Sequence, residues 1–398
     1  MKGILKRLGV CLVCLSMLAP GAMAAPAEPQ GAPELEAPSA VLMERETGAV
    51  LYAKGETERR PPASVTKVMT LLLAAEAVDS GALDLDEKVR ASANAASMGG
   101  SQIWLEEGEE LSVAELIKCV AVVSANDCAV ALAERIAGSE AAFVERMNER
   151  AAELGLENTR FTNCTGLFDD TGHYSCALDI ARMSCELLGH EWIREYTTIW
   201  MDSIRDGAFE LTNTNKLVRN YEGCTGLKTG YTSTAMYCLA ASAEREGTEY
   251  VAVIMHAESV ESRNRDAAAL LDYGFAGWRL CRTAEGVELP ELAVELGTAE
   301  RVGTVCDGGG AILLRVSDAQ GLERSLELPE SVAAPVRAGQ RLGTLVLSNG
   351  SGPLAEIPVL AAESVPRLGA AGVFLRMLGL LAGLSGGSGE SAGAFGGL

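Results

Sequence analysis

The sequence predicts a mixed α/β domain followed by a small all-β sandwich domain, and three observations support this fold class. Long apolar runs between residues 39 and 280 alternate between helical and strand patterns. Residues 285–362 instead hold short alternating segments separated by turn signals, which is typical of a sandwich. A chain of 398 residues, 48% of them hydrophobic, is long enough to bury both cores.

The α/β domain begins with a predicted hairpin at residues 39–52, after a linker at residues 25–38 that is rich in Pro, Ala and Glu. The pair at residues 61–62 is Pro-Pro, which suits entry into a helix because the missing N–H groups are not needed there. The following run, residues 68–77, contains good helix formers and no Gly or Pro. We therefore expect Ser64 to lie in the first turn of a mostly buried helix.

Residues 112–138 predict two helices joined by a tight turn. Ser112 and Glu115 have the spacing of a capping box at the start of the first helix. Polar Ser124 and Asn126 interrupt the apolar run, which then resumes with helical spacing. A simple helix cap is the alternative reading of these two polar residues. Further helices are expected at residues 139–156 and 177–188, on either side of a long polar loop at 157–174.

The last elements of the first domain are predicted strands at residues 236–243 and 250–256 and a closing helix at 267–275. In the second domain, Asn349-Gly350 is a strong hairpin signal. The predicted organisation is a signal peptide at 1–24, a linker at 25–38, the α/β domain at 39–280, the β-sandwich domain at 285–362, and a tail at 363–398.

The two ends of the chain predict export and contact with a membrane surface. Residues 1–24 have a charged start, an apolar stretch and the small-residue cleavage site Ala22-Met23-Ala24 of a signal peptide. In the tail, residues 368–384 are apolar but short and carry Arg376, which favours a helix lying in the membrane plane. A helix docked on its own domain is the alternative. We expect the protein at the extracytoplasmic face of the membrane or in the cell wall.

Composition excludes several classes of partner. The net charge of −21 argues against nucleic acid, and no Gly-rich phosphate loop appears. Three histidines without ligand spacing argue against a metal site, and we expect no cofactor. Of eleven cysteines, Cys11 and Cys14 lie in the signal peptide, and the odd number that remains cannot all pair within the chain. We therefore infer a non-oxidising exterior and not a disulfide framework.

Ser64 and Lys67 form a Ser-x-x-Lys motif that could carry out nucleophilic catalysis. At i and i+3 on a helix the hydroxyl and the amine face the same way. A serine hydroxyl becomes a good nucleophile when a neighbouring base takes its proton, and a buried lysine can be that base if burial and a second cation lower its pKa. Taken alone, the motif is also compatible with a capping serine and a surface lysine.

Two further motifs follow in the chain, Ser124-Ala125-Asn126 and Lys228-Thr229-Gly230. Together the three motifs, in this order, are the set found in serine β-lactamases and penicillin-binding proteins. Ser64 would attack a peptide carbonyl, Lys67 would take its proton, and Ser124 would relay the proton to the leaving amine. Asn126 would hydrogen-bond the substrate amide and Lys67. Lys228 would supply the positive charge that keeps Lys67 deprotonated and would attract a substrate carboxylate, which Thr229 would also bind. Gly230 would let the substrate backbone lie against the strand, and the N–H groups of Ser64 and Tyr231 would stabilise the oxyanion.

These motifs resemble the low-molecular-weight penicillin-binding proteins of the type-5 group, which are D-alanyl-D-alanine carboxypeptidases of peptidase family S11. The resemblance covers roughly residues 37–362 and implies a serine β-lactamase/transpeptidase-like catalytic domain with a β-sandwich stalk. It also implies a peptidoglycan stem peptide as substrate and β-lactam antibiotics as inhibitors. Arg263 matches the family's carboxylate-binding arginine, although Asn264 follows where the family has Phe. Residues 163–167, Asn-Cys-Thr-Gly-Leu, depart from the family's Pro-His-Gly-Leu type of run.

Two rival hypotheses are a class A-like β-lactamase and a catalytically silent module that binds the cell wall. The first adds a glutamate that activates water, and the Glu-x-x-Leu-Asn loop that carries it is absent between Ser124 and Lys228. The second is disfavoured because all three motifs are intact.

Overall fold

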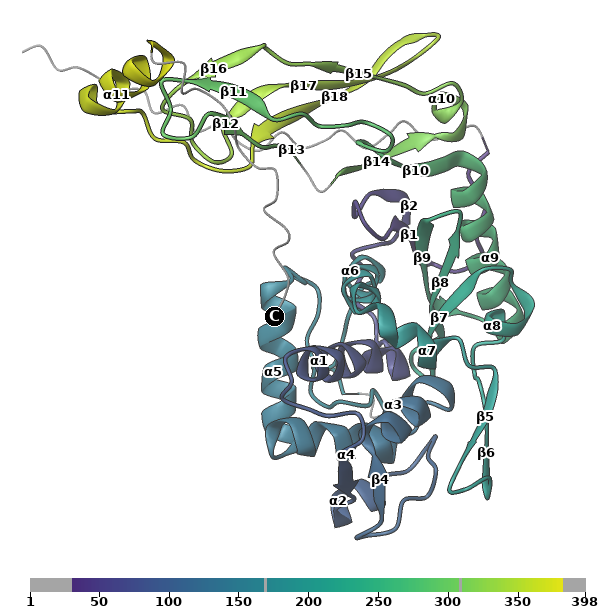
Figure 1. Cartoon of the computed structure of the whole chain (residues 1–398). Coiled ribbons are helices and arrows are strands. Elements are labelled where there is room, and N and C mark those ends of the chain that lie inside the picture. The colour runs from purple at the N-terminus through teal and green to yellow at the C-terminus, as the bar shows by residue number, and fades with distance from the viewer. Residues whose placement is uncertain (1–30, 168–169, 308–309, 382–398) are drawn as a thin grey trace, which may run out of the picture.

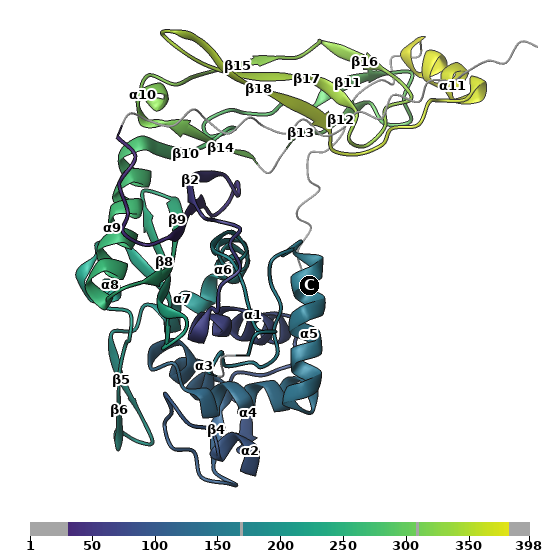
Figure 2. The same cartoon turned by 180° about the vertical axis from the view of Figure 1, so that it is seen from behind.

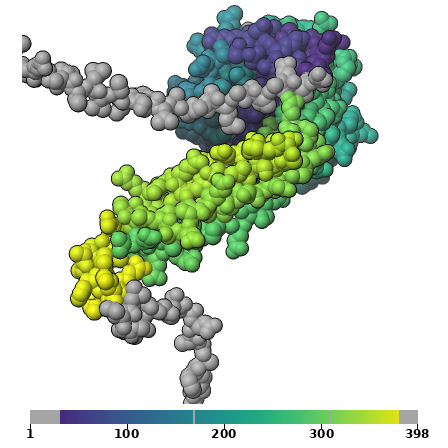
Figure 3. Space-filling view, turned by 90° about the horizontal axis from the view of Figure 1, so that it is seen from above, coloured from purple at the N-terminus to yellow at the C-terminus, as the bar shows by residue number. Residues whose placement is uncertain are grey.

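The computed structural model describes residues 31–167, 170–307 and 310–381, which form two parts (Figure 1). The first part is an α/β domain, and the second is an elongated β-rich domain that projects from it, as the view from above shows (Figure 3). The predicted signal peptide and the Gly/Ser-rich end of the tail lie outside the described residues. The predicted fold class is confirmed.

The α/β domain is built on a five-stranded antiparallel sheet with strand order β2-β1-β9-β8-β7. The predicted hairpin and the two predicted strands are all present in it. Strand β7 is an edge strand, so one side of it is open to another group. The strands are β1 (Ser39–Glu44), β2 (Val50–Lys54), β7 (Cys224–Thr232), β8 (Met236–Arg245) and β9 (Thr248–Ala257).

Helices cover both faces of this sheet because side chains alternate along the strands. On β9, Val251 and Val253 belong to a core shared with the helical region, whereas Ala252 and Ile254 pack with the last helix of the domain. Figure 2 shows that helix running along one side of the sheet. The main helices are α1 (Lys67–Asp79), α3 (Val113–Val122), α4 (Asn126–Ala137), α5 (Glu140–Glu153), α6 (Ala177–Gly189) and α9 (Val260–Gly277).

Two helix starts differ from the predictions. Ser64 lies in a 3₁₀ turn, η1 (Ala63–Thr66), that leads into α1, and Ala63 before it has a φ of +47°. The closing helix α9 begins at Val260, well before the predicted residue 267, because Ser259 and Ser262 form a capping box without the usual Glu. The predicted box of Ser112 and Glu115 is present at α3.

Several short elements were not predicted because each holds only a few residues. They are β3 (Lys88–Arg90), α2 (Ala93–Ala96), β4 (Glu110–Ser112), η2 (Glu191–Ile193), α7 (Arg194–Thr197), β5 (Met201–Ile204), β6 (Phe209–Thr212) and α8 (Leu217–Asn220).

The second domain contains a four-stranded, a three-stranded and a two-stranded sheet. Its first strand, β10 (Trp278–Arg282), pairs with β14, so the predicted boundary at residue 280 falls inside this strand. The Asn349-Gly350 hairpin joins β17 and β18. The other elements are β11 (Leu292–Glu295), β12 (Arg301–Val302), β13 (Thr304–Cys306), β14 (Ala311–Arg315), α10 (Val316–Ala319), β15 (Glu323–Glu327), β16 (Ser331–Ala333), β17 (Arg341–Asn349), β18 (Gly352–Ala361) and α11 (Ala370–Leu381).

Helix α11 lies at the end of the second domain that is far from β10 (Figure 1). Within the described ranges, no helix has both the length and the apolar character that a membrane span requires.

Candidate active site

A cavity of about 420 Å³ opens where η1, the turn between α3 and α4, and the edge strand β7 meet. Six of the predicted site residues line it. None of the described residues that line it is acidic. These are Ser64, Ser101, Ser124, Thr214, Lys216, Thr229, Gly230, Tyr231, Tyr237, Val260 and Arg263.

Ser64 and Lys67 are in direct contact. The Nζ atom of Lys67 lies 3.0 Å from the Oγ atom of Ser64 and 2.7 Å from the carbonyl oxygen of Thr165. Burial lowers the pKa of the Lys67 amine from 10.5 to about 7, because the charged form loses its water. At neutral pH a large fraction of this amine is therefore free to accept the Ser64 proton.

The cause of this shift corrects one expectation. Lys228 was expected to supply the charge that lowers the pKa of Lys67, but burial alone accounts for the lowering, and the nearby Cys164 and Asp127 oppose it. The repulsion acts on Lys228 instead. Its pKa is lowered by burial first and then by Lys67 and Arg263.

Ser124 and Asn126 both present unsatisfied polar atoms at the site. Ser124 is almost fully buried with a φ of +65°, and its Oγ atom has no hydrogen-bond partner among the residues that the structure describes. The Nδ2 atom of Asn126 donates to the carbonyl of Gly99 at 2.7 Å, while its Oδ1 atom has no partner among the same residues. The expected hydrogen bond from Lys67 to Asn126 is not formed, because the Lys67 amine is turned toward Thr165.

Strand β7 carries the third motif along the open edge of the sheet. The Nζ atom of Lys228 donates to the carbonyl of Thr229 at 2.9 Å, and Lys228 is buried. The Oγ1 atom of Thr229 lies 2.8 Å from that of Thr214. At Gly230, a Cβ atom would come within 2.9 Å of the Pro62 carbonyl oxygen. The glycine therefore also lets β7 approach the turn that holds the nucleophile.

Tyr231 and Arg263 complete the predicted set. Tyr231 is half exposed, and its ring centroid lies 4.5 Å from that of Tyr237. Arg263, on α9, is buried, and burial lowers the pKa of its guanidinium to about 10, so it stays charged at neutral pH. Its Nε atom donates to Oδ1 of Asn264, the residue that departs from the family pattern.

Sequence reasoning missed the contribution of two polar segments. The loop at 157–174 supplies the Thr165 carbonyl to Lys67, and the segment around Thr214 forms one wall of the cavity. Thr214 and Lys216 alternate with buried Asn213 and Asn215, so the exposed pair faces the cavity. This alternation in the run Asn-Thr-Asn-Lys was a signal that could have been noticed.

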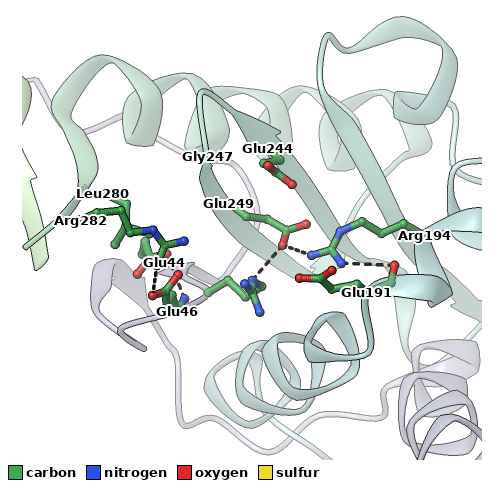
Figure 4. A pocket seen from close by; sticks show the side chains of 10 residues that line it. Glu44, Glu46, Glu191, Arg194, Glu244, Gly247, Glu249, Leu280 and Arg282 are labelled. Atoms are coloured by element: carbon green, nitrogen blue, oxygen red, sulfur yellow. Dashed lines mark hydrogen bonds and ion pairs between the residues drawn. The ribbon is translucent and has the colours of Figure 1, made fainter. Parts of the chain in front are cut away.

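A second cavity, of about 400 Å³, is lined mainly by charged residues (Figure 4). At its centre the carboxylate of Glu249 pairs with Arg194, with Arg45 at 3.0 Å, and with the hydroxyl of Thr225 at 2.8 Å. Arg282 at its edge pairs with Glu46. Because these charges satisfy one another, we interpret this cavity as a structural ion-pair cluster.

The described residues contain no group of three or more His, Cys, Asp or Glu side chains that could hold a metal ion. The first cavity brings together a hydroxyl, an amine whose pKa is about 7 and several hydrogen-bond donors. A serine activated by a lysine on the next helical turn, beside a second serine and a Lys-Thr-Gly edge strand, defines the class of penicillin-binding serine acyl-enzymes.

Comparison with known proteins identifies the family within this class. The family described as D-alanyl-D-alanine carboxypeptidase, peptidase S11, matches residues 25–259, and the domain described as penicillin-binding protein 5, C-terminal domain, matches residues 283–367. The chain belongs to this family.

Individual relatives span most of the chain. The D-alanyl-D-alanine carboxypeptidase DacF of Bacillus subtilis is 43% identical over 346 residues, covering 84% of this chain and 87% of that protein. The structure of penicillin binding protein 5 from Haemophilus influenzae superimposes with a TM-score of 0.73 at 29% identity, covering 84% of this chain and 99% of that chain. Penicillin binding protein 6B from Escherichia coli gives a TM-score of 0.69 at 30% identity, over 84% of this chain and 97% of that chain.

Proposed function

We propose that this protein is a serine D-alanyl-D-alanine carboxypeptidase that removes the terminal D-alanine from peptidoglycan stem pentapeptides. The observation that carries the proposal is the contact between the Ser64 hydroxyl and a Lys67 amine whose pKa is about 7. The cation Arg263 lines the same cavity, where a substrate with a free carboxylate end would find its counter-charge.

In the first half-reaction, Lys67 takes the proton of Ser64 as the Ser64 oxygen attacks the carbonyl carbon of the penultimate D-alanine. The tetrahedral oxyanion forms beside the N–H groups of Ser64 and Tyr231. The C–N bond then breaks, and the leaving nitrogen receives the proton through the unpaired hydroxyl of Ser124. The products are free D-alanine and an ester on Ser64.

In the second half-reaction, water attacks the ester, and Lys67 again serves as the base. The tetrahedral intermediate collapses to return the proton to Ser64 and release the shortened peptide. Among the residues that the structure describes, no acidic side chain lines the cavity, so none of them takes the place of the water-activating glutamate of a class A-like β-lactamase. Penicillin would acylate Ser64 in the same way, and the resulting ester would be hydrolysed slowly.

Release of D-alanine from a defined pentapeptide, followed together with labelling by a fluorescent penicillin, tests this proposal. We expect the wild-type protein to do both and the Ser64→Ala variant to do neither while keeping its thermal unfolding temperature. D-alanine release by the alanine variant would place the nucleophile elsewhere. Labelling without D-alanine release would exclude the carboxypeptidase activity.

A membrane-surface location is the second part of the proposal. On α11, four large apolar side chains are exposed on one face of the helix, and Arg376 ties the helix to the β-rich domain through Glu300 at 2.7 Å. Their exposed fractions are 61% for Phe374, 67% for Leu375, 58% for Met377 and 46% for Leu378. A helix held at the domain's far end with an apolar face outward suits insertion into the boundary of a lipid layer.

Sedimentation with phosphatidylcholine vesicles tests this part. These vesicles carry no net charge, so the net charge of −21 does not oppose binding. We expect the protein to sediment with the vesicles and a variant with all four apolar residues replaced by Ser to remain in solution, with unchanged activity on a soluble peptide. Equal sedimentation of the two proteins would exclude α11 as the anchor.

A further inference from the structure

The polar loop at 157–174 contacts the Ser64 turn η1 and the first turn of α1 at four separate places. Three of the contacts are hydrogen bonds, and the fourth is the close packing of a glycine. The pairs are the Cys164 carbonyl with Thr70, the Thr165 carbonyl with Lys67, Gly166 with the Ala63 carbonyl, and His173 with Thr66. The first three contacts use the backbone of the loop, so His173 is the one member whose side chain makes the contact.

His173 begins a short chain of hydrogen bonds. Its Nδ1 atom accepts the backbone N–H of Thr162 at 3.0 Å, which leaves the ring proton on Nε2. The Nε2 atom lies 2.8 Å from the Oγ1 atom of Thr66, and that hydroxyl donates to the carbonyl oxygen of Ala63 at 2.8 Å. His173 and Thr66 are both buried, so water does not compete for these bonds.

The chain ends on the peptide group that joins Ala63 to Ser64. A peptide group is planar, so fixing the direction of its C=O also fixes the direction of its N–H. That N–H belongs to Ser64 and is one of the two donors expected to stabilise the oxyanion. The φ of +47° at Ala63 is uncommon for a residue with a side chain, and such a conformation persists only where the surroundings impose it.

We propose that His173 is a positioning residue, which acts through Thr66 to hold the Ala63–Ser64 peptide plane so that the Ser64 N–H points at the developing oxyanion. This inference rests on the proposed function, because it concerns the same acylation step. His173 touches neither the substrate nor the reacting atoms. Its loss should therefore weaken stabilisation of the transition state and leave binding of the ground state unchanged.

Replacing His173 by amide side chains of two lengths distinguishes its positioning of the Ala63–Ser64 peptide from mere support of the loop. In His173→Gln the longer side chain brings an N–H to the place of Nε2 and keeps the bond to Thr66. In His173→Asn the shorter side chain reaches only the place of Nδ1 and keeps the bond to Thr162. Thr66→Ser keeps the hydroxyl of the chain, and Thr66→Val removes it at similar volume.

The acylation rate constant for penicillin is measured apart from the dissociation constant of the first complex. Removal of one oxyanion donor costs about 10²- to 10³-fold, so misdirection of a donor that remains present should cost less, on the order of 10-fold. We expect that loss for His173→Asn and Thr66→Val, near wild-type rates for His173→Gln and Thr66→Ser, and an unchanged dissociation constant throughout. The double variant His173→Asn with Thr66→Val should be no slower than either single variant.

The carbonyl stretch of the acyl-enzyme ester gives a second, spectroscopic readout. Hydrogen bonds from the oxyanion donors lower this frequency, so it should move to a higher wavenumber in His173→Asn and Thr66→Val and stay in place in the two conservative variants. Equal rates for the Asn and Gln variants, additive losses in the double variant, or an unmoved ester stretch would each overturn the inference. If the wild-type protein itself is not acylated, the proposed function fails first, and the two failures remain distinguishable.

Discussion

Gly166 lies directly against the carbonyl group of Ala63: a Cβ atom on residue 166 would come within 1.8 Å of that carbonyl oxygen and 2.6 Å of Thr66 Oγ1. Its φ of +70° also disfavours any side chain. In Gly166→Ala the loop or the Ser64 turn must therefore move. We expect penicillin acylation to fall by about 100-fold or more, since an ångström of misplacement can cost that much. Stopped-flow labelling measures it.

Gly172 is the matched control in the same loop. A Cβ atom there would meet Thr162 at an ordinary 3.4 Å, and the backbone needs no positive φ. Gly172→Ala should acylate at the wild-type rate. If Gly166→Ala did so as well, the close approach of the loop to the Ser64 turn would have no role in catalysis.

The second prediction concerns the pH dependence set by Lys67. Its pKa of about 7 means that the neutral, proton-accepting form is gained as the pH rises through 7. The acylation rate constant should therefore climb from pH 6 to pH 8 and then level off. Lys67→Arg should be nearly inactive across this range, because a guanidinium keeps its proton. A flat profile in the wild type would exclude Lys67 as the base.

The same shift makes a separate prediction about stability. In the unfolded chain Lys67 titrates near 10.5, so between pH 7 and pH 10.5 the unfolded state holds a proton that the folded state lacks, and stability rises with pH. Below pH 7 the buried charge is a constant burden of about 3–5 kcal/mol. Lys67→Met removes this term. We compare the free energy of unfolding, measured in urea, of Lys67→Met and of the wild type. The difference between them should be most favourable to the variant at pH 6 and should shift toward the wild type as the pH rises to 10.

The parts of the site that local patterns specify could be predicted from the sequence. Each of the three motifs spans only a few residues of the chain: the Ser64–Lys67 pair, the polar turn at Ser124 and the Lys-Thr-Gly strand. Helix and strand periods fix where the side chains within such a short motif point. The Thr165 carbonyl could not be predicted, because it lies 98 residues from Lys67 and is an ordinary backbone group. The pairing of β10 with β14 is likewise set by tertiary contact, so no local sequence pattern indicated it.

Glu249 in the ion-pair cluster offers a test of stability away from the active site (Figure 4). It is 4% exposed and holds Arg45 and Arg194, so Glu249→Gln leaves two guanidinium groups without their counter-charge. Since the arginine side chains are 25% and 19% exposed, the cost should lie between the ~1 kcal/mol of a surface pair and the ~3–5 kcal/mol of a buried one, which calorimetry would show as a drop in Tm of a few degrees. Glu246, whose side chain is 71% exposed beside Arg279, is the control, and Glu246→Gln should change the Tm little. If Glu249→Gln changed the Tm as little as Glu246→Gln, the cluster would add no stability.

The last prediction concerns how the site distinguishes a chain end from an internal peptide bond. Only the chain end carries a free carboxylate, and charge-assisted hydrogen bonds to it would provide the selectivity. The Thr229 hydroxyl lies at the cavity wall and is held by Thr214 at 2.8 Å, so it is oriented before substrate arrives. Thr229→Val keeps the volume and removes the hydroxyl. A charged hydrogen bond lost in this way costs about 2–3 kcal/mol, roughly 30- to 150-fold in rate.

The measurement is the ratio of kcat/KM for a peptide ending in free D-Ala-D-Ala to kcat/KM for its C-terminal amide. Thr229→Val should lower this ratio strongly, because the amide starts low and has little to lose. Arg263→Gln should lower it less, since Asn264 already shares the guanidinium. Thr214→Val, which frees the Thr229 hydroxyl to rotate, should lower it least. If all three variants keep the wild-type ratio, the carboxylate is read by other groups, and Lys216 on the same wall becomes the next residue to test.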